Sequence, residues 1–452
     1  MHLIQPAHRL SRFLRPAMRP DALAYRKGLA FRASSWSWSP DRKSDWTLGR
    51  LREVVRHAWG HSRHYRELLD GIGFDPRADF GFADFARLPV LERATVNDRA
   101  AELRCDDLSP AQSRRDATGG STGKPTEFWT GPAERGWRES GIEHYMRRVG
   151  VPSGSSIALL WAHHLDPVAR TTLRDRLHDA VFNVRWFDCL RVSAPTLERY
   201  HHELARWRPS CVVAYAGALN ALAELARDRG YTPSYPSHCL VTGAEKLLPE
   251  QRELVQAVFG RPVHERYGSR DIGLMGFQTT PWKSGGFEID WANVLIEPEG
   301  NDPDSPILVT KLHGDAMPMM RYRIGDLGRF PAGSAPGHPT FSLVDVVGRA
   351  ADRLWLPDGR WVHGLGIPHL MKDHPVSDFQ LHQRADLSIV IRVVARPGFD
   401  DASGARILET IRANLPGVPI ELSLVDAIPK TASDKRRPVV SEVEPRPHVP
   451  TR

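Results

Sequence analysis

Apolar residues recur along this chain with two different spacings, and the alternation of the two predicts an α/β protein. One apolar residue every three or four positions is typical of an amphipathic helix. This spacing occurs at Leu48, Leu51, Val55, Ala58 and Trp59, at Leu197, Tyr200, Leu204 and Trp207, and at Leu219, Leu222 and Leu225. Short continuous apolar runs predict buried strands at residues 156–161, 211–216, 238–242, 307–312 and 388–394. Strands and helices in alternation favour layers of helices packed on a sheet.

The chain has 452 residues, more than one typical domain, and the same pattern divides it. Thr47 can cap the first of these helices, so the basic, tryptophan-containing residues 1–46 are expected to form a separate arm. Gly348 ends a strand-like run, and a new strand pattern follows it. We therefore expect a large domain at residues 47–348, a smaller one at 349–440 and a proline-rich, disordered tail at 441–452.

Composition and charge narrow the class of protein. Hydrophobic residues make up 41% of the chain, enough for a sizeable core, yet no apolar run approaches the roughly 18 residues of a membrane span. The first 20 residues lack the apolar core of a secretory signal, and the four cysteines form no C-x-x-C pair. A cytoplasmic protein without disulfides or a zinc site is therefore expected. The net charge of +7 favours an anionic partner. Since no basic helix carries interleaved aromatic residues, ATP or CoA is favoured over nucleic acid.

The stretch richest in candidate chemistry is Thr118-Gly119-Gly120-Ser121-Thr122-Gly123-Lys124-Pro125. Glycine allows backbone N–H groups to approach an anion closely, and successive N–H groups form a concave anion site. The hydroxyls and Lys124 add donors and a positive charge, so a polyphosphate is the expected ligand. The stretch is not a P-loop, because it is one residue short and has Pro125 where Ser or Thr would hold magnesium. A polar turn without a ligand is the alternative that this motif alone leaves open.

Later stretches carry further candidates. A carboxylate such as Asp271, in Tyr267-Gly268-Ser269-Arg270-Asp271, can bind Mg²⁺, and the Tyr267 ring can face an adenine. Asp326, in Tyr322-Arg323-Ile324-Gly325-Asp326-Leu327, can accept hydrogen bonds from the two hydroxyls of a ribose. The other candidates are Gly243-Ala244-Glu245-Lys246 after a predicted strand, His163 and His164 after Trp161, Gly348-Arg349, and Lys430 to Arg436 near the end. Turns and solvated charged segments are the plain alternatives at each position.

These stretches, in this order, resemble the motifs of the adenylate-forming enzymes: acyl-CoA synthetases, luciferases and nonribosomal adenylation domains. Residues 51–107 are similar to the opening of one branch, which contains phenylacetate–CoA ligases and related proteins of capsule biosynthesis. The resemblance covers roughly residues 51–440. It implies a large N-terminal layered α/β domain followed by a small, mobile C-terminal α+β lid.

The resemblance also implies a reaction. A carboxylic acid, small or aromatic, attacks ATP to give acyl-AMP and pyrophosphate, and a thiol, CoA, then takes the acyl group. ATP, Mg²⁺ and CoA are the implied cofactors and co-substrates. Two alternatives stay open: a ligase that uses an amine or attaches AMP without CoA, and a nucleotide-binding protein without activity. Departures from the family pattern at Arg270, Asp271, Ala351 and Asp434 keep the second alternative open.

The family's residue roles carry over by motif. The glycine loop and Lys124 would hold the β- and γ-phosphates, and Lys435 would bridge the carboxylate and the α-phosphate. The implied nucleotide contacts are Thr118, Gly119, Gly120, Ser121, Thr122, Gly123, Gly243, Glu245, Tyr267, Gly268, Ser269, Asp326 and Arg349. Asp271 is the implied metal ligand. Trp161, His163 and His164 are expected beside the acyl substrate.

Overall fold

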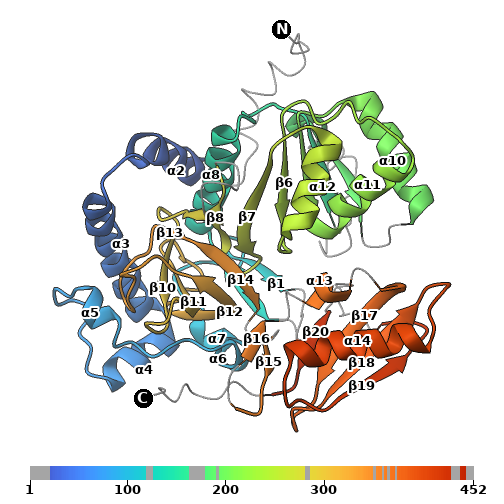
Figure 1. Ribbon diagram of the computed structural model, residues 1–452. Helices are drawn as coiled ribbons and strands as arrows, with labels where there is room; N and C mark the ends of the chain where they lie inside the picture. The colour runs from blue at the N-terminus through green and yellow to red at the C-terminus, as the bar shows by residue number, and fades with distance from the viewer. Residues whose placement is uncertain are drawn as a thin grey trace. The chain divides into compact units, whose positions relative to one another are not determined.

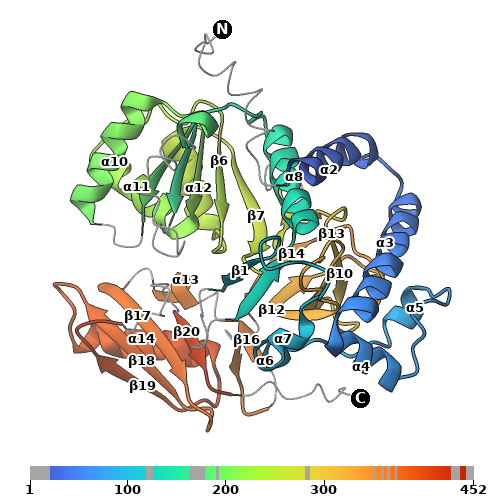
Figure 2. The same cartoon turned by 180° about the vertical axis from the view of Figure 1, so that it is seen from behind.

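The structure, a computed structural model, describes residues 21–118, 126–161, 179–189, 193–279, 286–349, 353–358, 361–363, 367–371, 374–428 and 438–443. These residues form two compact units (Figure 1; Figure 2 gives the view from behind). The first unit holds the described residues up to 118 with Thr126–Ile324 and Gly328–Val346. The second holds Gly325–Leu327 and the described residues from Val347 onward.

The first long helix begins earlier than the sequence predicted. Helix α3 spans Pro40–His61, and the Ser39 side chain caps it by accepting a hydrogen bond from the Arg42 backbone N–H. The predicted cap, Thr47, is wrong: it lies inside α3 and is buried. Serine before a proline at the first helical position is the stronger start signal, because the proline φ suits a helix and its missing N–H needs no partner.

The N-terminal segment is not a separate arm. Its described part forms α2 (Ala22–Ser35) and the start of α3, and α2 packs along α8 (Pro132–Arg148) in the first unit. The helices approach closely at Gly136, where an added Cβ would lie 2.6 Å from the Tyr25 nitrogen. The predicted arm at residues 1–46 is thus wrong for its described residues. The tryptophans of this segment, Trp36, Trp38 and Trp46, are half-buried, and all three pack against Trp291.

The first unit's larger sheet has eight strands in the order β13-β9-β8-β7-β6-β5-β3-β4. Figure 1 labels β6, β7, β8 and β13 of this sheet. They span Ile157–Trp161 (β3), Val184–Asp188 (β4), Cys211–Tyr215 (β5), Cys239–Gly243 (β6), Val263–Ser269 (β7), Gly273–Phe277 (β8), Phe287–Ile289 (β9) and Ser342–Leu343 (β13). Strands β4, β3, β5, β6 and β7 are parallel neighbours, and β8, β9 and β13 continue the sheet antiparallel. The predicted strands at residues 156–161, 211–216 and 238–242 are confirmed as β3, β5 and β6.

Apolar residues cover this sheet on both faces. On one face, residues such as Leu160, Val212 and Leu240 pack in one cluster with α10 (Ala194–Trp207), α11 (Ala216–Asp228) and α12 (Pro249–Phe259). On the other face, Val213 and Val241 share a second cluster with Tyr145 of α8. Burial on both faces explains why the strands are apolar throughout, as is usual for parallel sheets.

A second sheet carries the rest of the first unit's core. Its order is β10-β11-β12-β14, with β10 at Val294–Pro298, β11 at Asp304–Lys311, β12 at Tyr322–Arg329 and β14 at Asp345–Arg349. Its residues Val294, Ile296, Ile307 and Val309 share one cluster with Leu51 and Val55 of α3. The remaining elements are α4 (Arg63–Gly71), α5 (Phe82–Phe85), α6 (Arg93–Asp98), α7 (Ala100–Leu103) and the hairpin of β1 (Arg114–Ala117) and β2 (Glu127–Thr130). Across the described residues, no helix combines the length and apolar character needed to cross a bilayer.

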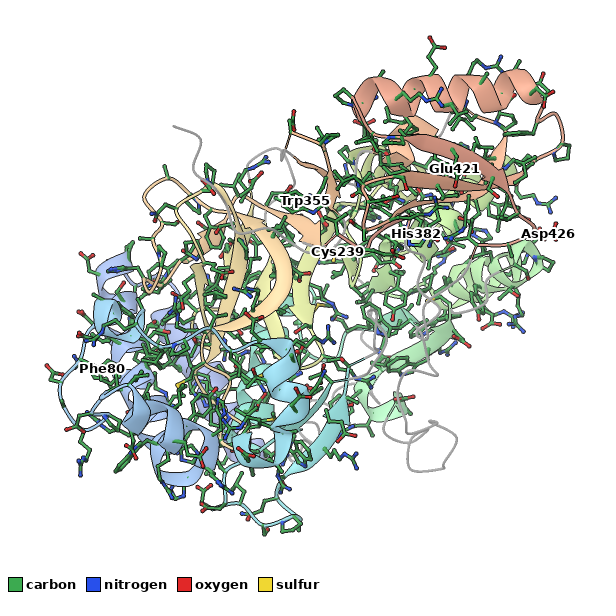
Figure 3. The ribbon with its side chains drawn as sticks, turned by 90° about the horizontal axis from the view of Figure 1, so that it is seen from below. Phe80, Cys239, Trp355, His382, Glu421 and Asp426 are labelled. Atoms are coloured by element: carbon green, nitrogen blue, oxygen red, sulfur yellow. The ribbon has the colours of Figure 1, made fainter. Side chains whose placement is uncertain are left out.

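The second unit is an α+β structure. Its sheet has the order β19-β18-β17-β20, with strands at Val376–Gln383 (β17), Ile389–Ala395 (β18), Ile420–Leu424 (β19) and Val439–Ser441 (β20). Helix α14 (Asp401–Asn414) buries Ile407 and Ile411 in one cluster with Leu381 and Ile391 of the sheet. His382 of β17, labelled in Figure 3, lies 2.7 Å from the Glu442 carboxylate. The short elements are β15 (Arg353–Trp355), β16 (Trp361–His363) and α13 (Ile367–Met371).

We expect the buried ion pair that joins α2 to the sheet region to matter for stability. Arg32 donates two hydrogen bonds of 2.9 Å to Asp290 and a third, of 2.7 Å, to the Ser140 hydroxyl, and both charged side chains are almost fully buried. Arg32→Ala leaves the Asp290 carboxylate buried without its cation, which typically costs about 3–5 kcal/mol. Urea denaturation should show this as a lower midpoint.

Arg63→Ala is the matched control, because Arg63 pairs with Glu67 on the exposed surface of α4. Its midpoint should stay near that of the parent, since exposed pairs contribute little. Equal midpoints for the two variants would contradict the role given to Arg32.

Candidate active site

The carboxyl ends of the parallel strands gather several predicted site residues at one edge of the large sheet. Trp161 is the last residue of β3, Gly243 of β6 and Ser269 of β7. Ligands of open α/β sheets bind outside this edge, because the loops that follow the strands and the N-termini of the next helices face it. The structure thus brings Trp161, Gly243, Glu245 and the stretch from Tyr267 to Asp271 to one side of the first unit.

The base of the glycine-rich stretch is a fixed hairpin. Strands β1 and β2 pair antiparallel up to Ala117 and Glu127. Beyond them, the Thr118 N–H donates to the Thr126 carbonyl at 2.9 Å, and the Thr118 hydroxyl accepts from the Thr126 N–H at 3.0 Å. Arg93 donates to both threonine hydroxyls at 2.8 Å. Thr118 therefore closes the loop together with Arg93, a residue that the sequence did not single out. Residues 119–125, including Gly119, Gly120, Ser121, Thr122, Gly123 and Lys124, lie outside the described residues.

The turn after β6 ties two neighbouring elements to the sheet edge. Glu245 is exposed, and its Oε2 accepts a hydrogen bond of 3.0 Å from the Gly217 N–H in the first turn of α11. A carboxylate is favourable there because it faces the positive end of the helix dipole. The next residue, Lys246, donates to the Asp345 carboxylate at 2.6 Å and to the Val346 carbonyl at 2.9 Å. Glu245 thus has a structural contact in addition to its predicted place beside an adenine.

The stretch from Tyr267 to Asp271 forms the tight connection between β7 and β8. Gly268 is required by close packing, because an added Cβ would lie 2.6 Å from the Gly273 carbonyl oxygen. Tyr267 is only 8% exposed, and its ring packs edge-to-face on Phe287. Core packing thus fixes the Tyr267 ring, and its contact with an adenine stays a prediction.

Asp271 has the chemistry of a Mg²⁺ ligand. Its side chain is buried, and Oδ1 accepts a 2.6 Å hydrogen bond from the Ser269 hydroxyl, which orients the carboxylate. Mg²⁺ prefers oxygen ligands and is commonly bound through one or two carboxylates together with phosphate oxygens. The neighbouring Arg270 points its charge elsewhere, toward Asp116 at 3.4 Å. Asp271 and its Ser269 partner therefore fit the ion that the sequence implied.

Two predicted nucleotide residues belong to the second unit. Asp326 is half-buried on β12 and follows Gly325, whose φ of +89° favours glycine. Arg349 is the last residue of β14. On the same strand as Asp326, Arg323 is held by Glu299 at 2.8 Å and also pairs with Glu92. Arg323 is thus a structural cation. His163, His164 and Lys435 lie outside the described residues.

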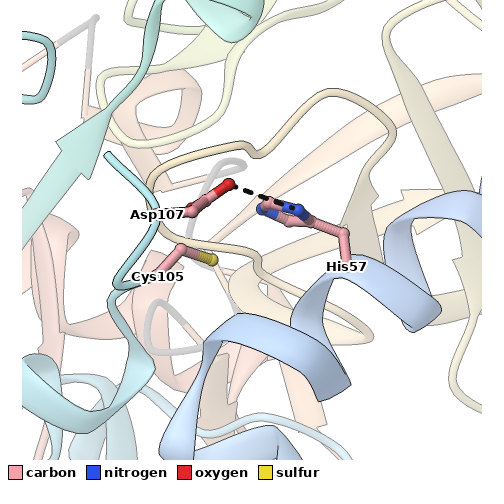
Figure 4. Close-up of side chains that lie close together, drawn as sticks. All are labelled: His57, Cys105 and Asp107. Atoms are coloured by element: carbon pink, nitrogen blue, oxygen red, sulfur yellow. Dashed lines mark ion pairs between the residues drawn. The ribbon is translucent and has the colours of Figure 1, made fainter. Parts of the chain in front are cut away.

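A second group of polar side chains lies on other elements. His57 of α3, Cys105 and Asp107 place their ligand atoms within 4.8 Å of one another (Figure 4). His57 Nδ1 is 3.9 Å from the Asp107 carboxylate, and its Nε2 is 3.1 Å from the Asp315 carbonyl oxygen. Burial, with nearby carboxylates, raises the pKa of the Cys105 thiol and so keeps it protonated. A neutral thiol is a weak metal ligand, and the group carries none of the motif residues.

Two cavities also lie away from the sheet edge. One, of about 670 Å³, is lined by residues of α2, α3 and α8 such as Phe31, Trp46 and Trp137. The other, of about 240 Å³, adjoins His57 and Asp315. No described site residue predicted from the sequence lines either cavity.

Comparison with known proteins finds distant relatives. No protein-family model matches the chain. Protein CapK of Staphylococcus aureus is 20% identical over 339 residues, which cover 72% of this chain and 74% of CapK. The phenylacetate-coenzyme A ligase of Thermus thermophilus is 26% identical over 294 residues. That alignment covers 62% of this chain and 63% of the ligase, so the match spans less than two thirds of the ligase.

Among solved structures, 2-hydroxyisobutyryl-CoA ligase in the postadenylation state, in complex with R3-HIB-AMP, aligns with a TM-score of 0.67. The alignment has 20% sequence identity and covers 90% of this chain and 91% of that ligase. The chain has the fold of the adenylate-forming ligases. The fold class predicted from the sequence is therefore confirmed, and the distant relatives support the predicted superfamily. The individual site residues stay predictions.

We expect Gly268 to tolerate no side chain. Gly268→Ala should lower the midpoint of thermal unfolding, because the new methyl group would collide with the β8 backbone at Gly273. Overpacking of this kind typically costs about 1–3 kcal/mol.

The control is Gly49→Ala, in the interior of α3, where an added Cβ meets nothing within 4 Å. Alanine should raise stability there by about 0.5–1 kcal/mol, through its higher helix propensity. A Gly268→Ala midpoint at or above that of the parent would show that the connection between β7 and β8 can relax.

Proposed function

We propose that this chain is an ATP-dependent ligase that activates a carboxylic acid as an acyl-AMP and transfers the acyl group to CoA. The observation that carries the proposal is the motif set on an adenylate-forming fold, with Glu245, Ser269 and Asp271 at the carboxyl edge of the parallel sheet. The similarity to phenylacetate-coenzyme A ligases supports the thiol acceptor and a small or aromatic acid. The reaction would take place in the cytoplasm, where ATP and CoA are available.

Two displacements make up the reaction. In the first, a carboxylate oxygen of the acid attacks the α-phosphorus of ATP; the bond to the β-phosphate oxygen breaks, and pyrophosphate leaves. In the second, the CoA thiolate attacks the acyl carbon of acyl-AMP; a thioester forms, and AMP leaves. Both steps depend mainly on position and on stabilisation of developing negative charge.

The residues of this chain divide these tasks. Thr118 and the glycine loop would supply N–H and hydroxyl donors to the phosphates, with Lys124 as cation. Asp271 would hold Mg²⁺, which neutralises phosphate charge. Gly243 and Glu245 would border the nucleotide base, and Asp326 and Arg349 the ribose and α-phosphate. Lys435 would act on the α-phosphate during the first step only.

Pyrophosphate release over a panel of carboxylic acids tests the proposal. With ATP, Mg²⁺ and a suitable acid, the purified protein should release pyrophosphate and, after CoA is added, form the acyl-CoA thioester. Pyrophosphate release without thioester formation would support the first step and would indicate that the acceptor is not CoA but another group, such as an amine. If no acid in a broad panel supports pyrophosphate release while Mg·ATP still binds, the chain is a nucleotide-binding protein without this activity.

We expect Mg·ATP to raise the melting temperature of the protein, and Asp326→Ala to reduce that shift. A ligand at a hundred times its Kd stabilises the folded state by about 2.7 kcal/mol. The substitution would remove two charge-assisted hydrogen bonds to the ribose, each worth about 1.5–3 kcal/mol, so ATP should bind at least about a hundredfold more weakly. The control is Asp304→Ala, whose carboxylate pairs with Arg329 at 2.7 Å. If Asp326→Ala binds ATP with the same Kd as the parent, Asp326 does not hold the ribose.

Lys435→Ala should separate the two half-reactions. Loss of one preorganised cation typically slows the step that uses it by about 10²–10³-fold. Pyrophosphate release should therefore fall by that factor, whereas conversion of supplied acyl-AMP and CoA to thioester should keep its rate. Equal losses in both steps would indicate a folding defect, and normal pyrophosphate release would refute the role of Lys435.

A further inference from the structure

Four residues form a single row across the carboxyl edge of the parallel sheet. The register pairs Tyr215 of β5 with Gly243 of β6. It also pairs Leu160 with Ala214, and Thr242 with Glu265, so the next positions set Trp161 beside Tyr215 and Arg266 beside Gly243. Residues in one such row project from the same face of a sheet. Here it is the face covered by α8, because Val213 and Val241, two positions earlier, share a cluster with Tyr145.

Glycine at position 243 lets the arginine lie across the row. An added Cβ on Gly243 would be 2.9 Å from Cγ and 3.0 Å from Nε of Arg266. The side chain passes over this position and brings its guanidinium carbon 4.9 Å from the centre of the Trp161 ring. The Trp161 and Tyr215 rings contact each other, with centroids 4.2 Å apart. The result is two aromatic rings with a guanidinium beside them.

Arg266, which is half-buried, differs from the buried arginines of the first unit. Within the described residues, no carboxylate lies within ion-pair distance of its guanidinium, and burial lowers its pKa. Comparable arginines each have an acidic partner: Arg32 with Asp290, Arg252 with Glu265, and Arg321 with Glu297. Partial burial of a cation without an anionic partner costs free energy, so the row favours the binding of a negatively charged group.

The side chains of the row keep exposed surface that a ligand can contact. Trp161, Tyr215 and Arg266 are each half-buried, so each keeps some exposed surface. Nearby, the Tyr145 hydroxyl is buried and has no hydrogen-bond partner in the described part of the chain. It lies close enough to Arg266 for the two to influence each other electrostatically. The row adjoins the turn of Glu245, a predicted nucleotide contact, and the connection that carries Asp271, the predicted metal ligand.

We infer that Arg266 selects an aromatic substrate acid that carries a second carboxylate, with the aromatic ring of that acid resting on Trp161 and Tyr215. Offset or edge-to-face contact favours an aromatic ring on this wall. The planar guanidinium matches a carboxylate with two parallel hydrogen bonds. The first carboxylate of the acid stays free for activation. This inference rests on the proposed ligase activity and names the substrate class for it.

Paired acids test the inference in the parent protein. The pairs are benzoate with benzene-1,4-dicarboxylate, and phenylacetate with 4-carboxyphenylacetate; kcat/KM for pyrophosphate release is measured for each. The diacid of at least one pair should be preferred by about 10- to 100-fold, the range expected for a charge-assisted contact. Arg266→Ala should remove this preference by slowing the diacid alone, and Arg266→Lys should keep part of it.

Arg185→Ala is the matched control, because Arg185 lies 4.5 Å over the Trp207 ring in the same cation–π arrangement but is exposed on β4. It should keep the parent preference. The melting shift caused by Mg·ATP serves as a separate readout, and Arg266→Ala should leave it unchanged. If Arg266→Ala fails to fold, Arg266→Gln and the parent comparison still decide the question.

Three outcomes would overturn the inference, and they are distinguishable. An active parent that prefers the monoacid in both pairs, or shows no preference, refutes it and leaves the ligase function intact. Equal losses for both members of a pair in Arg266→Ala would mean that Arg266 only supports the Trp161 ring. No pyrophosphate with any acid would refute the proposed function and this inference with it.

Discussion

The parallel register of β3, β5, β6 and β7 is the constraint on which the first unit's chemistry depends. Parallel strands of similar length that pair in register also end together, so residues distant in sequence meet at the carboxyl edge of the sheet. Trp161, Tyr215, Gly243 and Arg266 span more than a hundred positions of the chain and yet occupy one row. A shift of one residue in any pairing would turn its side chain to the opposite face. The apolar residues earlier in each strand prevent such a shift, because both faces of the sheet are buried.

Helix α8 holds this edge in relation to the second sheet through charged groups. Glu134 forms a buried ion pair of 2.9 Å with Lys311 of β11, while Arg138 donates at 2.8 Å to the Arg270 carbonyl in the connection that carries Asp271. Burial raises the pKa of Glu134, an effect that the neighbouring cations oppose. Buried pairs are a poor source of net stability, but they penalise every arrangement that separates the partners. The same helix therefore fixes the position of the predicted metal ligand.

The sequence predicts those parts of the structure that local patterns determine. Apolar runs locate β3, β5 and β6, and motif spacing locates the turns that follow them. The predicted cap at Thr47 is wrong because several residues can cap a helix, and here Ser39 and Pro40 provide the start of α3. The motif around Tyr267 carries no information about burial, so the contact of its ring with Phe287 could not be predicted. No local pattern points to Arg266, since its relation to Trp161 depends on the register across three strand pairs.

The turn after β6 shows how neighbouring contacts hold a strained backbone residue in place. Ala244 has φ +66°, a left-handed conformation that costs an L-residue about 1–2 kcal/mol relative to glycine. The residues on each side are anchored: Gly243 lies beneath the Arg266 side chain, Glu245 binds the first turn of α11, and Lys246 binds Asp345. These contacts over-determine the path of the backbone, so the strained residue is held in place. Strain that persists under such anchoring is characteristic of sites where the backbone itself must present a surface to a ligand. The predicted contact of this turn with a nucleotide base is consistent with that demand, because it depends on backbone position and little on the side chain at position 244.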